Sequence, residues 1–152
     1  LICAPGCVFE HQLERVDQEA VLARAREHLA PEGVFVLATR FPRPESMVNA
    51  EEEQDWFSYT DERGRDVRVT GTDSYDPVRQ IRHETAYRRW HDAQGNEVTR
   101  RARLALRLVF PQEMEALLSY NGFAVLHRYG DWDSGPLTGD SSLIIWECRK
   151  AV

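Results

Sequence analysis

The chain has 152 residues with 42% hydrophobic and 29% charged side chains, a composition that suits one globular domain with a core and excludes a disordered chain. It contains no apolar run of about 18 residues, so we expect no membrane span. A net charge of −6 and a pI near 5.4 argue against a nucleic-acid partner, which usually selects a basic protein.

The three cysteines, Cys3, Cys7 and Cys148, are odd in number and lack the spacing of a zinc site. This pattern predicts reduced thiols in a cytoplasmic protein. The chain opens on residues 1–4, which we interpret as the end of a short buried strand, without the charged start of a signal peptide. We therefore expect the sequence to be cut from a longer protein.

Residues 16–41 carry the strongest local pattern. Asp17 suits a helix N-cap, and the apolar period of 3.6 predicts a helix over 17–29 that stops before Pro31. Residues 34–38 then form an unbroken apolar run of strand length, which is typical of a strand covered on both faces. A helix followed by such a strand predicts half of a parallel α/β unit.

In the middle of the chain, apolar and polar side chains alternate with a period of two. We interpret residues 42–54 as a surface connection with a helical turn, followed by a strand pair over 55–75. Residues 78–90 and 98–110 alternate around a loop at 92–96 that is rich in turn residues. This is the pattern of a long antiparallel hairpin.

One face of this predicted hairpin is rich in arginine. It carries Arg101, Arg103 and Arg107 on one strand, and we expect Arg82 and Arg88 to join them from the partner strand. Two interpretations remain open: an anion or nucleic-acid site, or a solvated sheet surface neutralised by Glu84 and the acidic loop. The second is favoured because the strands lack the interleaved aromatic side chains that single-strand binders use for stacking.

The end of the chain predicts one helix and two strands. Pro111 opens a helix over 112–121, Gly122 ends it, and strands follow at 123–129 and 143–148. The loop at 130–140 starts like a calcium loop, but it lacks the glycine and the closing glutamate that such a loop requires. We therefore predict no metal site.

Several of these segments together resemble the C-terminal half of class I S-adenosylmethionine-dependent methyltransferases. They are strand 1–4, helix 17–29, the turn 29–33 with its following strand, the helix that leads into Phe123, and the final segment 140–146. The similarity is closest to small-molecule members with an antiparallel insertion after the fifth strand.

This resemblance implies an α/β fold, a partial Rossmann-like sheet with strands equivalent to 4-5-7-6. The chain 1–152 would be a single domain in which 42–109 forms the antiparallel insertion, either a lid or an oligomer contact. The implied activity is methyl transfer from S-adenosylmethionine to oxygen, nitrogen or carbon of a small-molecule acceptor, without a metal.

The resemblance also implies site residues. Cys3, Ala4 and Pro5 would end their strand beside the methionine end of the cofactor. His11 is the candidate catalytic base, and its alternative is a locally bonded loop histidine. Residues 9–13, beginning with Phe9, would lie near the acceptor.

Other side chains are candidates for holding the acceptor. Arg40 would orient a carboxylate or hydroxyl group, or would simply be exposed. Four aromatic side chains would wall an acceptor pocket, with core positions as the alternative: Trp56, Tyr59, Tyr129 and Trp132.

No Gly-x-Gly-x-Gly sequence follows any predicted strand. The glycine-rich loop that binds the cofactor in this family is therefore missing. We expect this chain alone to be inactive and not to bind S-adenosylmethionine. The strand at 1–4 would lack its usual neighbour, which predicts a homo-oligomer through that edge. The alternative function is a non-catalytic interaction or anion-binding domain built on the antiparallel sheet.

Overall fold

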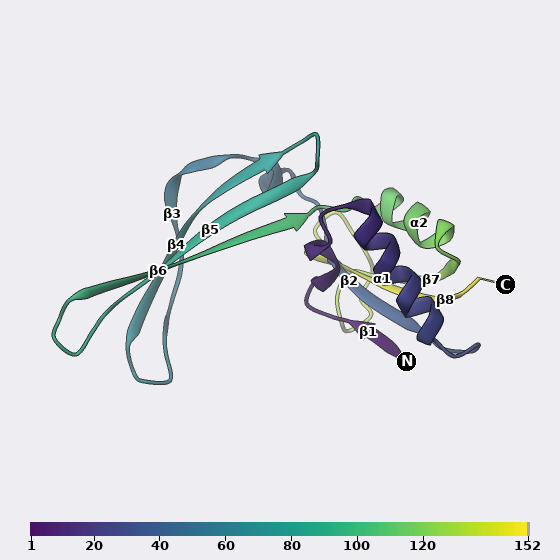
Figure 1. The fold of residues 1–152 in the computed structure, drawn as a ribbon, viewed down its shortest axis with the longest axis horizontal. Helices are drawn as coiled ribbons and strands as arrows, with labels where there is room; N and C mark the ends of the chain where they lie inside the picture. Colours follow the sequence, from purple (N-terminus) through teal and green to yellow (C-terminus); the bar gives the residue numbers. More distant parts are fainter. Residues whose placement is uncertain (152) are drawn as a thin grey trace. The chain divides into compact units, whose positions relative to one another are not determined.

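The computed structural model describes residues 1–151, which form two compact units. The first unit combines Leu1–Arg43 with the described chain from Leu106 onward, and the second is Pro44–Ala105. Figure 1 shows the helices and strands of both units.

The first unit contains a four-stranded sheet in the order β1-β2-β8-β7. β1 (Ile2–Ala4) pairs parallel with β2 (Phe35–Arg40), while β8 (Leu143–Lys150) pairs antiparallel with both β2 and β7 (Phe123–Tyr129). This arrangement is the predicted 4-5-7-6 order, and the predicted α/β fold class is confirmed. β1 lies at an edge of the sheet, as expected.

Two helices accompany this sheet, α1 (Arg15–His28) and α2 (Pro111–Tyr120). The prediction that Asp17 caps the first helix is wrong, because the extended residue before α1 is Glu14. The Glu14 carbonyl already accepts hydrogen bonds from the backbone N–H groups of Asp17 and Gln18, at 3.1 and 3.2 Å. Asp17 therefore lies in the first turn, where its charge still suits the helix dipole.

The core of the first unit covers both faces of β2. Leu37, Ala38 and Thr39 are buried one after another, as the unbroken apolar run predicts. The indole Nε1 of Trp146 donates a 3.0 Å hydrogen bond to the Thr39 hydroxyl, so this fully buried pair satisfies its polar atoms. Side chains from both helices and from β2, β7 and β8 complete the core, among them Leu22, Phe35, Met114, Leu118, Phe123 and Ile144.

The second unit is a four-stranded sheet whose strands follow chain order, β3-β4-β5-β6. A single 3-10 turn, η2 (Pro44–Met47), precedes β3 (Ala50–Thr60), β4 (Asp66–Asp76), β5 (Ile81–His91) and β6 (Glu97–Arg107). β3 pairs antiparallel with β4, and β4 with β5. The predicted strand pair and the predicted hairpin are both present.

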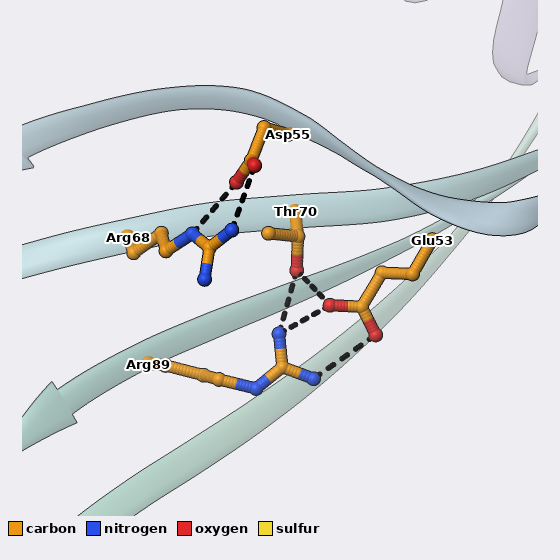
Figure 2. A network of polar contacts seen from close by, with 5 residues as sticks. All are labelled: Glu53, Asp55, Arg68, Thr70 and Arg89. Carbon is orange, nitrogen blue, oxygen red and sulfur yellow. Dashed lines mark hydrogen bonds and ion pairs between the residues drawn. The ribbon is translucent and has the colours of Figure 1, made fainter.

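The acidic segment 51–53 belongs to β3, so the predicted surface connection to residue 54 is too long. Its Glu53 carboxylate is held by partners on the next two strands of the sheet, β4 and β5 (Figure 2). Arg89 on β5 donates to Glu53 at 2.5 and 3.0 Å, and the Thr70 hydroxyl on β4 bonds both groups. These partners neutralise a charge that would otherwise disfavour the strand.

A second pair extends this polar network along the same sheet. Arg68 on β4 binds the Asp55 carboxylate of β3 through two bonds of 2.6 and 2.7 Å (Figure 2). The hydrogen bond from Arg68 holds the pKa of Asp55 below its usual range, and Arg89 does the same for Glu53. The network thus links β3, β4 and β5 through two carboxylates that lie at the protein surface.

The apolar core of the second unit is small. Val67, Val69 and Trp90 are buried, and Trp56 packs against them with Val98. The Trp56 ring lies over Gly71, where an added Cβ would come within 2.2 Å of it. Gly71 therefore makes room for an indole that the cluster needs.

We expect Gly71→Ala to destabilise the second unit by about 2 kcal/mol, because the new methyl group overlaps Trp56 and lies 2.7 Å from the Thr85 carbonyl oxygen. Thermal unfolding followed by tryptophan fluorescence measures the loss. Gly139→Ala is the matched control, since nothing lies within 4 Å of a Cβ there. Equal stability of the two variants would contradict the packing described for Trp56.

Acid should weaken the turn between β3 and β4. Asp61 accepts bonds from the Arg65 side chain and from two backbone N–H groups, which lower its pKa to about 2. Because the folded pKa lies below the unfolded value of about 3.9, the stabilisation is present above pH ~4 and is lost as the pH falls through about 2. Carbon-13 NMR of the Asp61 carboxyl group measures this; a midpoint near 3.9 would contradict it.

Candidate functional site

Three strands of the first unit end at the same edge of the sheet. β2 and β7 are both antiparallel to β8, and β1 is parallel to β2, so the carboxyl ends of β1, β2 and β7 coincide. Ligands of open α/β sheets bind outside the carboxyl ends of the strands. This edge, with the segments 5–14, 41–43 and 130–142 that leave it, is called the carboxyl edge below.

The chain turns sharply where it leaves β1. Gly6 and Cys7 both have positive φ, 65° and 58°, and Cys7 is a residue that rarely adopts this conformation. The turn leads into the 3-10 helix η1 (Val8–His11). Cys7 and Glu10 lie three residues apart, which places both on one side of such a turn, and both are buried.

Glu10 is 1% exposed, so its carboxylate requires a partner. Its Oε1 accepts a 2.5 Å hydrogen bond from the backbone N–H of Arg40, and its Oε2 lies 3.7 Å from Arg40 Nε. The Arg40 side chain is 41% exposed. A buried carboxylate therefore fixes a guanidinium group that reaches solvent at the end of β2.

Cys7 lies close to both members of this pair. Burial raises the pKa of the Cys7 thiol, the Glu10 charge raises it further, and the Arg40 charge and hydrogen bond lower it. The thiol is consequently protonated at neutral pH. Cys7, Glu10 and Arg40 form one polar cluster, which we call the Glu10–Arg40 cluster.

The loop 130–142 is tied to the end of β2. Arg43 donates to the backbone carbonyl groups of Asp140 and Ser141, the second at 3.4 Å. Within the loop, Asp131 accepts hydrogen bonds from the backbone N–H groups of Asp133 and Gly135, at 2.9 and 2.8 Å. These contacts hold one wall of the carboxyl edge.

The structure brings most of the predicted site residues of the first unit to this edge. Cys3 and Pro5 are exposed and Ala4 is half-buried at the end of β1. His11 is exposed on η1. Phe9 is 2% exposed and packs in the hydrophobic core, so its side chain faces away from solvent.

The predicted aromatic residues divide between the two units. Tyr129 ends β7 and donates to Glu147 at 3.4 Å, and Trp132 is half-exposed in the following loop, so both belong to the carboxyl edge. Trp56 and Tyr59 lie on β3 in the second unit. Trp56 packs against the core of that sheet, while Tyr59 is 42% exposed.

Sequence reasoning placed residues 9–13 near the acceptor but gave no role to Glu10, and it gave Cys7 no place in a site. The available signal was a cysteine and a glutamate spaced by three immediately after a strand, which suits a 3-10 turn that directs both side chains inward. Their partner, Arg40, lies 30 residues further along the chain, and no local pattern connects them.

The arginine face of the second unit is partly neutralised. Arg82 lies between the carboxylates of Asp73 and Glu84, at 3.0 and 3.1 Å. Arg101 and Arg103 are exposed on β6. The paired residues favour a solvated sheet surface over a continuous anion site.

Residues 1–151 contain no group of three or more His, Cys, Asp and Glu side chains placed to hold a metal ion. In the same range, every helix falls short of the length and apolar character that crossing a lipid bilayer requires.

Removing the charge of Glu10 and removing the charge of Arg40 should shift the pH dependence of Cys7 reactivity in opposite directions. Glu10→Gln removes a charge that raises the Cys7 pKa and should move the midpoint of Cys7 alkylation to lower pH, while Arg40→Gln should move it to higher pH. The measurement is iodoacetamide labelling against pH in a Cys3→Ser background, which removes the exposed thiol. Shifts in the same direction for both variants would contradict the geometry.

Neither a protein-family model nor a curated protein sequence matches this chain. Solved structures do match its fold. An S-adenosylmethionine-dependent methyltransferase from Clostridium acetobutylicum superposes with a TM-score of 0.81 at 12% identity, over 99% of this chain and 58% of that one. The CcbJ methyltransferase from Streptomyces caelestis gives 0.79 at 19% identity, over 99% and 56%.

A third match is CalS10 from Micromonospora echinaspora, an amino pentose methyltransferase whose structure contains bound S-adenosylmethionine. Its TM-score is 0.71 at 19% identity, over 97% of this chain and 58% of CalS10. The chain thus spans less than three-fifths of the length of these structures. At such identities the match concerns the fold, and the chain has the fold of part of these methyltransferases.

Proposed function

We propose that this chain is the C-terminal part of a longer S-adenosylmethionine-dependent methyltransferase that acts on a small-molecule acceptor. The observation that carries the proposal is the carboxyl edge, where a partly exposed Arg40 is fixed by buried Glu10 at the ligand-binding end of a methyltransferase-like sheet. The longer solved structures support the view that the activity requires more sequence than these residues.

The residues present fit only part of the cofactor. The turn after β1 contains one glycine, Gly6, and no Gly-x-Gly-x-Gly sequence follows any strand of the first unit. Cys3, Ala4 and Pro5 at the end of β1 would therefore border only the methionine end of S-adenosylmethionine. The remaining contacts would come from sequence outside these residues.

The bound cofactor would supply an electrophilic methyl group on a sulfonium centre, which needs no metal. The protein's own contribution is alignment of the acceptor and removal of a proton. Arg40 suits the first task, because its guanidinium is held in place and presents donors to an acceptor oxygen. His11, exposed at the same edge, is the proposed base.

The acceptor proposed here is a polar small molecule. CalS10, which shares the fold, is an amino pentose methyltransferase, and this supports a sugar-like acceptor with an amine or hydroxyl nucleophile. Tyr129 and Trp132 would form one wall of its pocket, since both lie at the carboxyl edge. Trp56 and Tyr59 belong to the second unit, which is the proposed lid or oligomer contact.

The outer edge of β1 is the proposed attachment point for the missing part. β1 pairs on one side with β2 and ends the sheet on the other, so its outer backbone groups are available to another strand. In the longer protein an upstream strand would pair there, and in the 152-residue chain alone we propose homo-oligomer formation. The three free cysteines support a reducing, cytoplasmic environment.

Calorimetry with S-adenosylmethionine tests the proposal. The 152-residue chain should show no binding, whereas the longer protein that includes the upstream sequence should bind and methylate. In that protein, Arg40→Gln should raise the acceptor KM about tenfold or more, because it removes a charged donor. Arg101→Gln, on the exposed face of β6, is the matched control and should leave KM unchanged.

Two outcomes would contradict the proposal. Tight binding of S-adenosylmethionine by the 152-residue chain would show that the cofactor-binding site is complete without upstream sequence. Salt-dependent binding of an anionic polymer, abolished by Arg101→Ala with Arg103→Ala, and no methyl transfer by the longer protein would favour the interaction domain instead.

A further inference from the structure

The second unit is an open sheet that ends in β3 on one side and in β6 on the other (Figure 1). β3 pairs antiparallel with β4, and β4 with β5. A tight turn joins β5 to β6, where the Asp92 backbone N–H donates to the Asn96 carbonyl oxygen at 2.9 Å. The two outer strands therefore run in opposite directions, and each has one side on which another strand can pair.

These two outer strands carry opposite charge. β6 contains four arginines and one glutamate. β3 contains no basic residue and four acidic ones, which are Glu51, Glu52, Glu53 and Asp55. Because opposite charges on facing strands stabilise their pairing, β3 of one copy of the chain suits β6 of another copy.

The arginines of β6 differ in their partners from those of the inner strands. Arg68 on β4 pairs with Asp55 of the same sheet at 2.6 Å. Arg101 and Arg103 on β6 are exposed, and neither forms an ion pair with any of residues 1–151. The positive charge of this edge is therefore available to an acidic strand from outside the sheet.

One face of the same sheet is apolar and carries exposed rings. Val67, Val69 and Trp90 form its buried cluster. Phe57 pairs with Val69 and Tyr59 pairs with Val67, so both rings lie on this face. Phe57 is 57% exposed and Tyr59 is 42% exposed, and their ring centroids are 6.2 Å apart. Exposed aromatic side chains beside a buried cluster are typical of a surface that another protein covers.

We propose that two copies of the chain associate through their second units, with β6 of each copy beside β3 of the other. A two-fold axis parallel to the strands keeps every neighbouring pair antiparallel, so the two four-stranded sheets close into one eight-stranded barrel. The apolar face turns inward, and the rings of Phe57 and Tyr59 become part of the barrel interior. Eight strands enclose a space that side chains can fill.

Closure at both seams distinguishes the barrel from two simpler arrangements. Pairing at one seam alone would leave one acidic and one basic edge unpaired, so further copies could add without limit. Stacking the two apolar faces would bury the rings but would leave both edges of each sheet unpaired. Of the three arrangements, the closed barrel alone satisfies the edges, their charges and the apolar face. It is separate from the proposed association at β1 and does not depend on methyl transfer.

Charge reversal tests both seams in the 152-residue protein. Arg101→Glu with Arg103→Glu gives an acidic variant, and Glu51→Lys with Glu52→Lys gives a basic variant. Each variant alone should self-associate at least about tenfold more weakly than the unchanged protein, because like charges then face each other at both seams. An equimolar mixture should recover the dimer, because opposite charges face each other again. Sedimentation velocity from about 1 to 100 μM measures the dissociation constants.

Two further variants separate this contact from general effects of charge and folding. Arg15→Glu with Arg24→Glu makes the same change in net charge on exposed positions of α1, and it should leave the association unchanged. Phe57→Ser replaces an exposed side chain, so it should fold normally, as circular dichroism of dilute samples measures. It should weaken the dimer about fivefold or more, because less apolar surface is buried.

Any one of three results would overturn the proposal: an acidic variant that associates as tightly as the unchanged protein, a mixture that stays as weakly associated as either variant alone, or a Phe57→Ser variant with an unchanged dissociation constant. Association through β1 alone would give the first result, since it does not involve the charges of β3 or β6. These measurements do not involve S-adenosylmethionine or methyl transfer, so the two proposals fail separately.

Discussion

The antiparallel insertion of β8 between β2 and β7 is the constraint on which the first unit depends. It makes β7 parallel to β2, and β2 is parallel to β1. The carboxyl ends of these three strands therefore lie at one edge of the sheet. The buried hydrogen bond between Trp146 on β8 and Thr39 on β2 fixes this pairing inside the core. The carboxyl edge depends on that order, since β8 pairs antiparallel with both of its neighbours and leaves them parallel to each other.

Glu10 shows how the fold prepares this edge. A carboxylate with 1% exposure is costly unless charged and polar partners surround it, and both come from Arg40. The left-handed backbone at Cys7 turns the chain inward so that Glu10 can reach them. Backbone strain and a buried charge thus occur within four residues of each other, at the end of the sheet where ligands of such folds bind.

The sequence predicted features that depend on neighbours in the chain. The apolar run of β2 and the alternation of β4 and β5 reflect local burial, and all three strands formed close to where they were expected. The start of α1 was misplaced because Asp17 is as good in a first turn as in a cap. The strand character of Glu53 was missed because Arg89, its partner, lies 36 residues away. Site roles for His11 and Phe9 stay predictions, and Phe9 lies in the core.

The two units also differ in what holds their strands together. The first has a dry core that includes Trp146 and Leu118, whereas the second relies on a few buried side chains and on ion pairs at solvent-accessible positions such as Arg68 with Asp55. Mobile ions screen accessible charges over about 8–10 Å at ordinary ionic strength, but they do not enter an apolar interior. A high salt concentration should therefore lower the stability of the second unit while leaving that of the first unit nearly unchanged.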